Sequence, residues 1–147
     1  MLRQVGAGQN RVDTIFVENA ATAHLQAADA LTPGSAVCGK AYFLSQGEPV
    51  NCWGWINEIL TLAGLPPVTK RISLQAAYAA GGVLEGVWTV LRRRDEPRMT
   101  RFLAAQLGTS HYFDISAARR DFGYQPSISQ AEGMRRLALE LHGRPVK

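Results

Sequence analysis

A nearly uncharged run from Ile72 to Leu91 constrains the fold of this 147-residue chain more than any other feature. The run is about twenty residues long, which is the length that a membrane-spanning helix needs. Gln75, Glu85 and the glycines within the run lower its apolar character. The pattern therefore favours a partly buried helix from Ser73 to about Arg93 that lines a lipophilic pocket. Arg92-Arg93-Arg94 closes the run, and peripheral attachment to a membrane surface is the alternative.

Shorter patterns predict the remaining elements, which mix strands and helices. Strands are predicted at residues 12–17, 40–45, 68–72 and 110–113. Helices are predicted at residues 20–31 with Asn19 as N-cap, 52–63 with Asn51 as N-cap, 99–107, 116–122, and from Ser129 to about His142. Neither a repeat nor a linker separates these elements, so the sequence predicts one unit over residues 1–147.

Composition excludes several classes of function. With 46% hydrophobic and 19% charged residues, the chain matches soluble globular domains and differs from disordered ones. Its formal charge of +4 comes without aromatic platforms or a recognition-helix pattern, so no nucleic-acid partner is predicted. Cys38 and Cys52 lie apart, and the N-terminus has no leader pattern, which together predict a reducing, cytoplasmic location.

Motifs that would carry catalysis or bind a metal are weak in this chain. Gly6-Ala7-Gly8 lacks the third glycine and the following helix of a dinucleotide loop, so a turn is favoured. His24, His111 and His142 lie far apart, and none has a ligand at metal-binding spacing. A G-x-S-x-G nucleophile elbow is missing as well. The sequence predicts no catalytic, cofactor-binding or metal-binding residue within the chain.

Three segments share the residue spacing of one known family. Residues 10–24 follow the pattern N-x-V-D-x-x-x-V-x-N-x-A-x-A-H, and residues 39–53 contain G-K-A-Y-F-L and G-E-P-V-N. Residues 113–126 contain D-I-S-A-A and G-Y-Q-P. These stretches resemble extended short-chain dehydrogenases, and within them the 3β-hydroxysteroid dehydrogenase/isomerase-like group. The resemblance covers nearly the whole chain in family order.

The resemblance implies an α/β fold, namely the C-terminal part of an extended Rossmann-type short-chain dehydrogenase, mostly helical with a few short strands. In that family a glycine-rich turn and a tyrosine followed four residues later by lysine would precede Met1. None of the four tyrosines here has a lysine at that spacing. Residues 1–147 are therefore expected to form a single substrate-binding lobe, whose partner is an N-terminal dinucleotide-binding half absent from the chain.

For the intact protein, the resemblance implies NAD or NADP and a lipophilic hydroxyl or keto substrate, such as a sterol or a long-chain 3-oxo acid. The isolated chain is expected to be inactive and to bind neither dinucleotide tightly. Asn10, Tyr78, Arg98 and Arg101 are the candidate substrate-binding residues, with the guanidinium forks suited to an anionic or carbonyl group. Arginines that merely flank a helix remain the alternative. A non-catalytic ligand-binding or partner-docking domain, with homodimerisation through its open surface, is the other function that the sequence leaves open.

Overall fold

The computed structural model describes residues 2–143, which group into two compact units. The first unit contains residues 2–12 and 51–111, and the second contains residues 13–50 and 112–143. About half of the chain is helical, and the strands are short. The expectation of a mostly helical fold with a few short strands is therefore confirmed. The expectation of one substrate-binding lobe over residues 1–147 stays a prediction.

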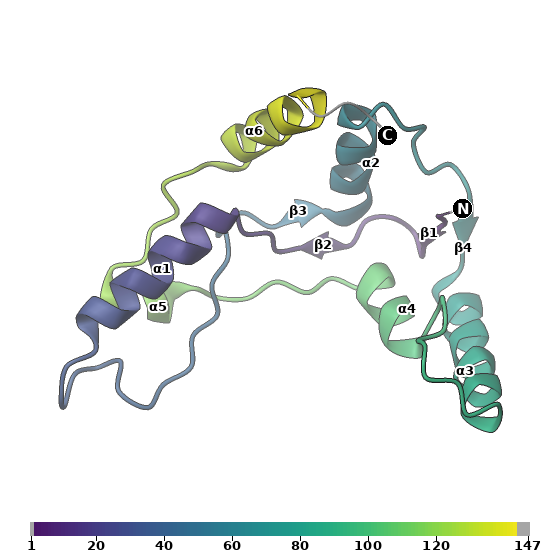
Figure 1. Ribbon diagram of the computed structural model, residues 1–147, viewed down its shortest axis with the longest axis horizontal. Coiled ribbons are helices and arrows are strands. Elements are labelled where there is room, and N and C mark those ends of the chain that lie inside the picture. Colours follow the sequence, from purple (N-terminus) through teal and green to yellow (C-terminus); the bar gives the residue numbers. More distant parts are fainter. Residues whose placement is uncertain (1, 144–147) are drawn as a thin grey trace. The chain divides into compact units, whose positions relative to one another are not determined.

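A parallel strand pair and a pair of helices organise the first unit. β1 (Gln4–Val5) pairs with β4 (Arg71–Ile72), and the N–H of Gln4 donates to the carbonyl of Lys70 at 2.8 Å. The other elements are β2 (Arg11–Val12), β3 (Val50–Asn51) at the point where the chain enters the unit, α2 (Cys52–Leu62), α3 (Leu74–Val90) and α4 (Arg101–Gly108). Helices α3 and α4 lie side by side (Figure 1).

Polar caps fix where the helices of the first unit begin. Asn51 accepts the N–H of Gly54 at 2.7 Å, and Ser73 accepts the N–H of Ala76 at 3.1 Å. These side chains satisfy N–H groups that have no partner within the helix. Both predicted starts are confirmed. Thr100 caps α4 in the same way, because its hydroxyl accepts the N–H of Leu103 at 3.0 Å.

The second unit contains α1 (Val17–Ala30), α5 (Ser116–Phe122) and α6 (Gln130–Gly143). Its core is a cluster of buried side chains made of Ala23, Ile115, Ala118 and Tyr124. The Tyr124 hydroxyl donates to the carbonyl of Ser45 at 2.9 Å, which satisfies the one polar atom of that buried ring. Helices α5 and α6 follow the predicted segments, and Gly123 ends α5 with a φ of 71°.

The prediction that Asn19 caps a helix is wrong, because α1 begins at Val17 and places Asn19 inside it. Asn19 is only 1% exposed, and its side chain holds other segments together. Its Nδ2 donates to Oε1 of Gln46 at 3.0 Å and to the carbonyl of Ile128 at 2.8 Å. Its Oδ1 accepts the N–H groups of Ser127 and Ile128 at 3.1 Å and 3.0 Å.

All four predicted strands are also wrong in extent, and of residues 68–72 only Arg71 and Ile72 form a strand, which is β4. Of residues 12–17, only Val12 is in a strand, because the following backbone groups bond to Gln46: the Thr14 carbonyl accepts the Gln46 N–H at 2.7 Å. Residues 110–113 contribute a single bridge, between His111 and Val12. Residues 40–45 belong to no strand among the described residues. Residues 40–45 favour a strand by residue type, but no neighbouring strand pairs with them within the described residues.

Candidate functional site

The start of α4 lies against the middle of α3 because two adjacent glycines leave room for it. A Cβ atom on Gly81 would lie 2.6 Å from both the backbone N of Arg101 and the carbonyl C of Thr100. A Cβ atom on Gly82 would lie 3.5 Å from Cδ of Arg101. Only glycine fits at position 81 without moving backbone, so the glycines that interrupt the apolar run bring Arg101 onto α3.

Glu85 fixes Arg101 in place. Its Oε1 accepts the backbone N–H of Arg101 and its Oε2 accepts Nε, both at 2.7 Å. The backbone hydrogen bond, followed by the side-chain one, lowers the pKa of Glu85, and the same carboxylate raises the pKa of Arg101. A Coulombic interaction with Tyr78 adds to the raised pKa of Arg101, and the Tyr78 side chain is about half exposed. Arg101 is therefore oriented, with its charge balanced.

Sequence patterns do not assign a role to Glu85. The available signal is that Glu85 is the one charged residue within the run from Ile72 to Leu91. A lone charge in such a run needs a partner when it is partly buried. That reasoning predicts an arginine or lysine packed on α3, but it does not say which one.

Arg98 lines a cavity of about 440 Å³ in the first unit. The cavity is walled by Leu84, Trp88, Arg93, Asp95, Glu96 and Arg98. Nε of Arg93 is 2.9 Å from Asp95, and the Arg93 guanidinium lies 5.1 Å from the Trp88 ring centre. The hydrogen bond from Arg93 lowers the pKa of Asp95. Arg98 takes part in none of the ion pairs found within residues 2–143, so its guanidinium is available to an anionic ligand.

Asn10 does not join the other three predicted substrate-binding residues. It is buried, and its Nδ2 donates to the carbonyls of Leu107 and Thr109, each at 3.3 Å. The Trp53 indole N–H donates to the same Leu107 carbonyl at 3.0 Å. Asn10 thus holds the end of α4, whereas Tyr78, Arg98 and Arg101 gather around α3 and the segment that links it to α4. A substrate contact by Asn10 stays a prediction.

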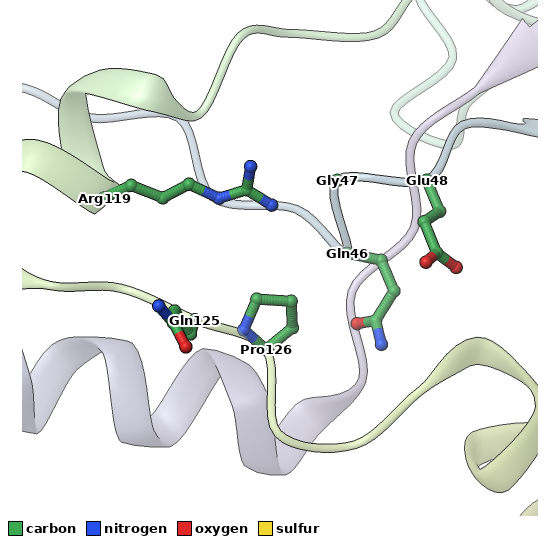
Figure 2. A pocket seen from close by; sticks show the side chains of 6 residues that line it. All are labelled: Gln46, Gly47, Glu48, Arg119, Gln125 and Pro126. Carbon is green, nitrogen blue, oxygen red and sulfur yellow. The ribbon is translucent and has the colours of Figure 1, made fainter.

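A second pocket, of about 390 Å³, lies within the second unit. Figure 2 shows the Arg119 side chain reaching from α5 toward Gly47, with Gln125 and Pro126 on the neighbouring segment. A Cβ atom on Gly47 would lie 2.9 Å from Nη2 of Arg119, so this glycine is required for the arginine to lie there. Gln46, at the edge of the pocket, is held by Asn19. Sequence patterns mark the Gln46–Pro49 turn but give no signal for Arg119.

The segment at residues 40–45, called here the strand-like segment, has the burial pattern of a strand without a partner strand. Tyr42 and Leu44 pack against the core cluster of the second unit, whereas Phe43 between them is 58% exposed. The Phe43 ring stacks on exposed Phe113 with ring centres 4.0 Å apart. Within residues 2–143, the backbone N–H and C=O groups of residues 41–44 have no hydrogen-bond partner. Such a row of free groups is a template for strand pairing.

Asp121 anchors this segment to α5. Its carboxylate accepts hydrogen bonds from Nζ of Lys40 at 3.0 Å and from the Tyr42 hydroxyl at 2.8 Å. The bond from Lys40, then that from Tyr42, lowers the pKa of Asp121 to about 2. The strand-like segment is therefore held at its start while its backbone stays open.

The turn at Gly6-Ala7-Gly8 does not fit the pyrophosphate of a dinucleotide. It connects β1 to β2, with φ of 74° at Gly6 and 78° at Gly8, and no helix starts after it. A Cβ atom on Gly8 would lie 2.3 Å from Nε2 of Gln4, so a side chain of the chain itself fills that side. Pyrophosphate recognition needs the free N–H groups of a helix N-terminus. The predicted turn is confirmed, and no step of a reaction is assigned to it.

Histidines and cysteines are scattered over the described part of the chain. His24 Nδ1 lies 2.7 Å from the Ala20 carbonyl and His142 Nδ1 lies 2.6 Å from the Ala138 carbonyl, each within its own helix. Within residues 2–143, no group of three metal-binding side chains comes together. Both cysteines are free thiols. In the same residues, no helix is long and apolar enough to cross a membrane.

Comparison with known proteins relates the chain to one family. The family model described as the 3-beta hydroxysteroid dehydrogenase/isomerase family matches residues 1–75. Two 2-alkyl-3-oxoalkanoate reductases are similar to it: that of Stenotrophomonas maltophilia is 52% identical over 92% of this chain and 41% of its own length. That of Shewanella oneidensis is 51% identical over 95% of this chain and 36% of its own length.

More distant relatives extend the comparison. The decarboxylating sterol-4-alpha-carboxylate 3-dehydrogenase of Mus musculus is 31% identical over 94% of this chain and 39% of its length. The crystal structure of gox2253 aligns with a TM-score of 0.57 at 23% identity, covering 94% of this chain and 41% of that one, which shows a shared fold. The chain thus spans about two fifths of the length of these proteins.

Proposed function

Since this chain belongs to the 3-beta hydroxysteroid dehydrogenase/isomerase family, we propose that it forms the substrate-binding part of an NAD(P)-dependent oxidoreductase for a lipophilic keto or hydroxyl compound. The observation that carries the proposal is its 52% identity to a 2-alkyl-3-oxoalkanoate reductase over 92% of the chain. The dinucleotide supplies or accepts hydride in such a reaction. The residues of this chain bind and orient the substrate.

A long-chain 2-alkyl-3-oxo acid is the substrate class that the first unit suits best. Such a molecule combines two apolar chains with a carboxylate beside a keto group. Arg98, which has no ion-pair partner in the described residues, lines a cavity next to Trp88 and Leu84 and can bind the carboxylate. Arg101 is held by Glu85 through its backbone N–H and its Nε, so its remaining guanidinium N–H groups are preoriented for a polar group of the substrate. The apolar chains then lie against Leu84 and Trp88 in the same cavity.

The dinucleotide would be bound by a further part of the enzyme that pairs with the strand-like segment. The support for this pairing is the alternating burial of residues 42–44 and the free backbone groups of residues 41–44. A neighbouring strand would satisfy these groups and cover the Phe43 and Phe113 rings. The chain alone is therefore expected to show no turnover, because its glycine turn does not fit the pyrophosphate.

The substrate class can be tested by comparing an acid with its ester. A 2-alkyl-3-hydroxyalkanoate and its methyl ester are titrated into the 147-residue chain. Binding is followed by tryptophan fluorescence, because Trp88 lines the Arg98 cavity. We expect the acid to bind more tightly than the ester. Because a hydrogen-bonded charge pair is at stake, Arg98→Gln should weaken acid binding roughly tenfold and leave ester binding unchanged.

Arg71→Gln provides the matched control, since it removes an exposed arginine from the same unit away from the cavity. Equal binding of acid and ester, or equal losses in the two variants, would contradict the proposed role of Arg98. Acid binding that depends on Arg98, together with no turnover when a dinucleotide-binding part is supplied, would instead favour a non-catalytic ligand-binding domain.

A further inference from the structure

The solvent-facing side of α3 carries no charged residue. Its bulkier exposed side chains are Val83, Val87 and Val90, with 67%, 42% and 81% of their surface accessible, and Leu91 beyond the helix end is 61% exposed. The other residues on that side are alanine, glycine and a few uncharged polar residues. Glu85, the one charged residue of α3, is paired with Arg101. A helix exposed to water normally presents charged residues outward, so the uncharged face of α3 is suited to contact with an apolar surface.

Arginines follow this apolar face directly. Residues 92–98 contain four arginines and two acidic residues, which gives a formal charge of +2. Arg93 is paired with Asp95, whereas Arg92, Arg94 and Arg98 take part in none of the ion pairs among the described residues. The helix end thus joins an uncharged apolar stripe to a cluster of unpaired cations.

Arg92 sits in a backbone conformation that normally selects glycine. Its φ is 49°, the one positive φ of a non-glycine residue within residues 2–143. The Arg93 N–H donates to the Trp88 carbonyl at 3.0 Å, which closes the helix around Arg92. Glycine is the usual residue here because a Cβ atom is strained in the left-handed region. Arg92 is exposed and takes part in none of the ion pairs among the described residues.

We propose that α3 and residues 92–98 form a docking surface for an anionic phospholipid bilayer, with the helix lying in the plane of the interface. The valine stripe enters the boundary between headgroups and acyl chains, while Arg92 and Arg94 contact lipid phosphates. The charge of the cluster and the uncharged helix face complement these two layers of a bilayer. This surface does not depend on the proposed activity.

Co-sedimentation of the 147-residue chain with vesicles tests the proposal. One set contains phosphatidylcholine alone and the other adds phosphatidylglycerol. We expect binding to the anionic set only, and a loss of binding as salt shortens the screening length from about 30 Å at 0.01 M to about 8 Å at 0.15 M. Val87→Asn with Val90→Asn should weaken binding roughly tenfold, because buried apolar area is lost. Arg92→Gly with Arg94→Gln should weaken it and remove most of the salt dependence.

Two matched double variants control for general effects. Val17→Asn with Leu139→Asn changes exposed apolar residues of the second unit, and Lys70→Gln with Arg71→Gln removes the same charge elsewhere in the first unit. Circular dichroism checks that every variant is folded. The proposal is overturned if the chain does not bind anionic vesicles, or if the controls lower binding as much as the α3 variants. It is also overturned if the chain self-associates without lipid and Val87→Asn with Val90→Asn abolishes that association, because a second copy is then the occupant.

Discussion

The two units differ in the contact that fixes their main elements. The second unit buries the amide of Asn19, with hydrogen bonds to three residues that are distant in the sequence. The first unit leaves the valine stripe of α3 in solvent and packs α4 against α3 through glycine. A buried amide fixes loops at defined positions, whereas a close glycine contact fixes helices and leaves their outer faces unconstrained. The first unit is therefore suited to apolar ligands and the second to holding segments in place.

The largest effect is expected from Asn19→Ala, which tests whether the polar network holds the second unit. The change leaves the Ile128 carbonyl and the N–H groups of Ser127 and Ile128 without their buried partner. Two or more such losses should lower the free energy of unfolding by about 4 kcal/mol. Urea unfolding followed by circular dichroism measures it. Thr22→Ala, at an exposed position on the same helix, should change the free energy of unfolding little. Equal losses in the two variants would show that the Asn19 network does not hold the second unit.

The next effect concerns the glycine contact of the first unit. Gly81→Ala places a Cβ atom 2.6 Å from backbone atoms of Thr100 and Arg101, so α4 must move away from α3. We expect a loss of about 3 kcal/mol in the free energy of unfolding, the upper range for an overpacked site. Tryptophan fluorescence isolates this unit, because Trp53, Trp55 and Trp88 all belong to it.

Gly86→Ala on the same helix is the control. A Cβ atom there meets nothing within 4 Å, so the better helix propensity of alanine should raise the free energy of unfolding by about 0.5–1 kcal/mol. A lower free energy of unfolding for Gly81→Ala and a higher one for Gly86→Ala would show that the close contact with α4 requires glycine at position 81. Equal losses of free energy of unfolding in the two variants would show that the contact of Gly81 with Thr100 and Arg101 is not the reason for glycine in α3.

Local patterns in the sequence predict the helices well but miss most of what the strands and buried amides do. Asn51 and Ser73 begin helices as predicted, because a cap depends on neighbours within a few residues. Asn19 has equally good capping chemistry, yet it bonds to residues about a hundred positions away, and no local pattern reports such partners. Residues 40–45 read as a strand, but a strand needs a neighbour that the described residues do not supply.

The candidate site divides in the same way. Tyr78 follows from its place in the apolar run, and Arg98 and Arg101 follow from residue type and from the family resemblance, which places their loop at the cleft. In the structure the three lie on α3, on the segment between α3 and α4, and at the start of α4. The ion pair of Glu85 with Arg101 and the position of Arg119 against Gly47 depend on packing between distant segments, which residue types alone do not specify. The resemblance places Asn10 at the cleft as well, but its buried side-chain amide donates to the backbone carbonyls of Leu107 and Thr109.

A smaller effect is expected from Arg92→Gly, which separates stability from surface chemistry in the first unit. Removing the Cβ atom at a φ of 49° relieves strain, so the free energy of unfolding should rise by about 1 kcal/mol. Thermal unfolding followed by tryptophan fluorescence measures it. A destabilised variant would mean that the Arg92 side chain makes a stabilising contact within the chain. That result would argue against the proposal that Arg92 contacts lipid phosphates.

The smallest effect is a pH dependence in the second unit. Asp121 has a folded-state pKa of about 2, below its ordinary value of 3.8, so its contribution to stability is present above about pH 4 and is lost as the pH falls toward 2. Asp121→Asn should flatten the fall in stability over this range, as measured by urea unfolding at several pH values. Asp29→Asn, an exposed change on α1, is the control. An unchanged slope in the Asp121 variant would show that the strand-like segment is not held by this carboxylate.

The most direct measurement mixes this chain with the part of the Stenotrophomonas maltophilia reductase that this chain does not match, and follows NADH or NADPH oxidation with a 2-alkyl-3-oxoalkanoate. We expect turnover in the mixture and none with either component alone, and we expect Phe43→Pro, which removes a free N–H of the strand-like segment, to abolish it. Turnover by this chain alone, or an inactive mixture in which the two components do associate, would contradict the assignment of the chain as the substrate-binding part of the enzyme.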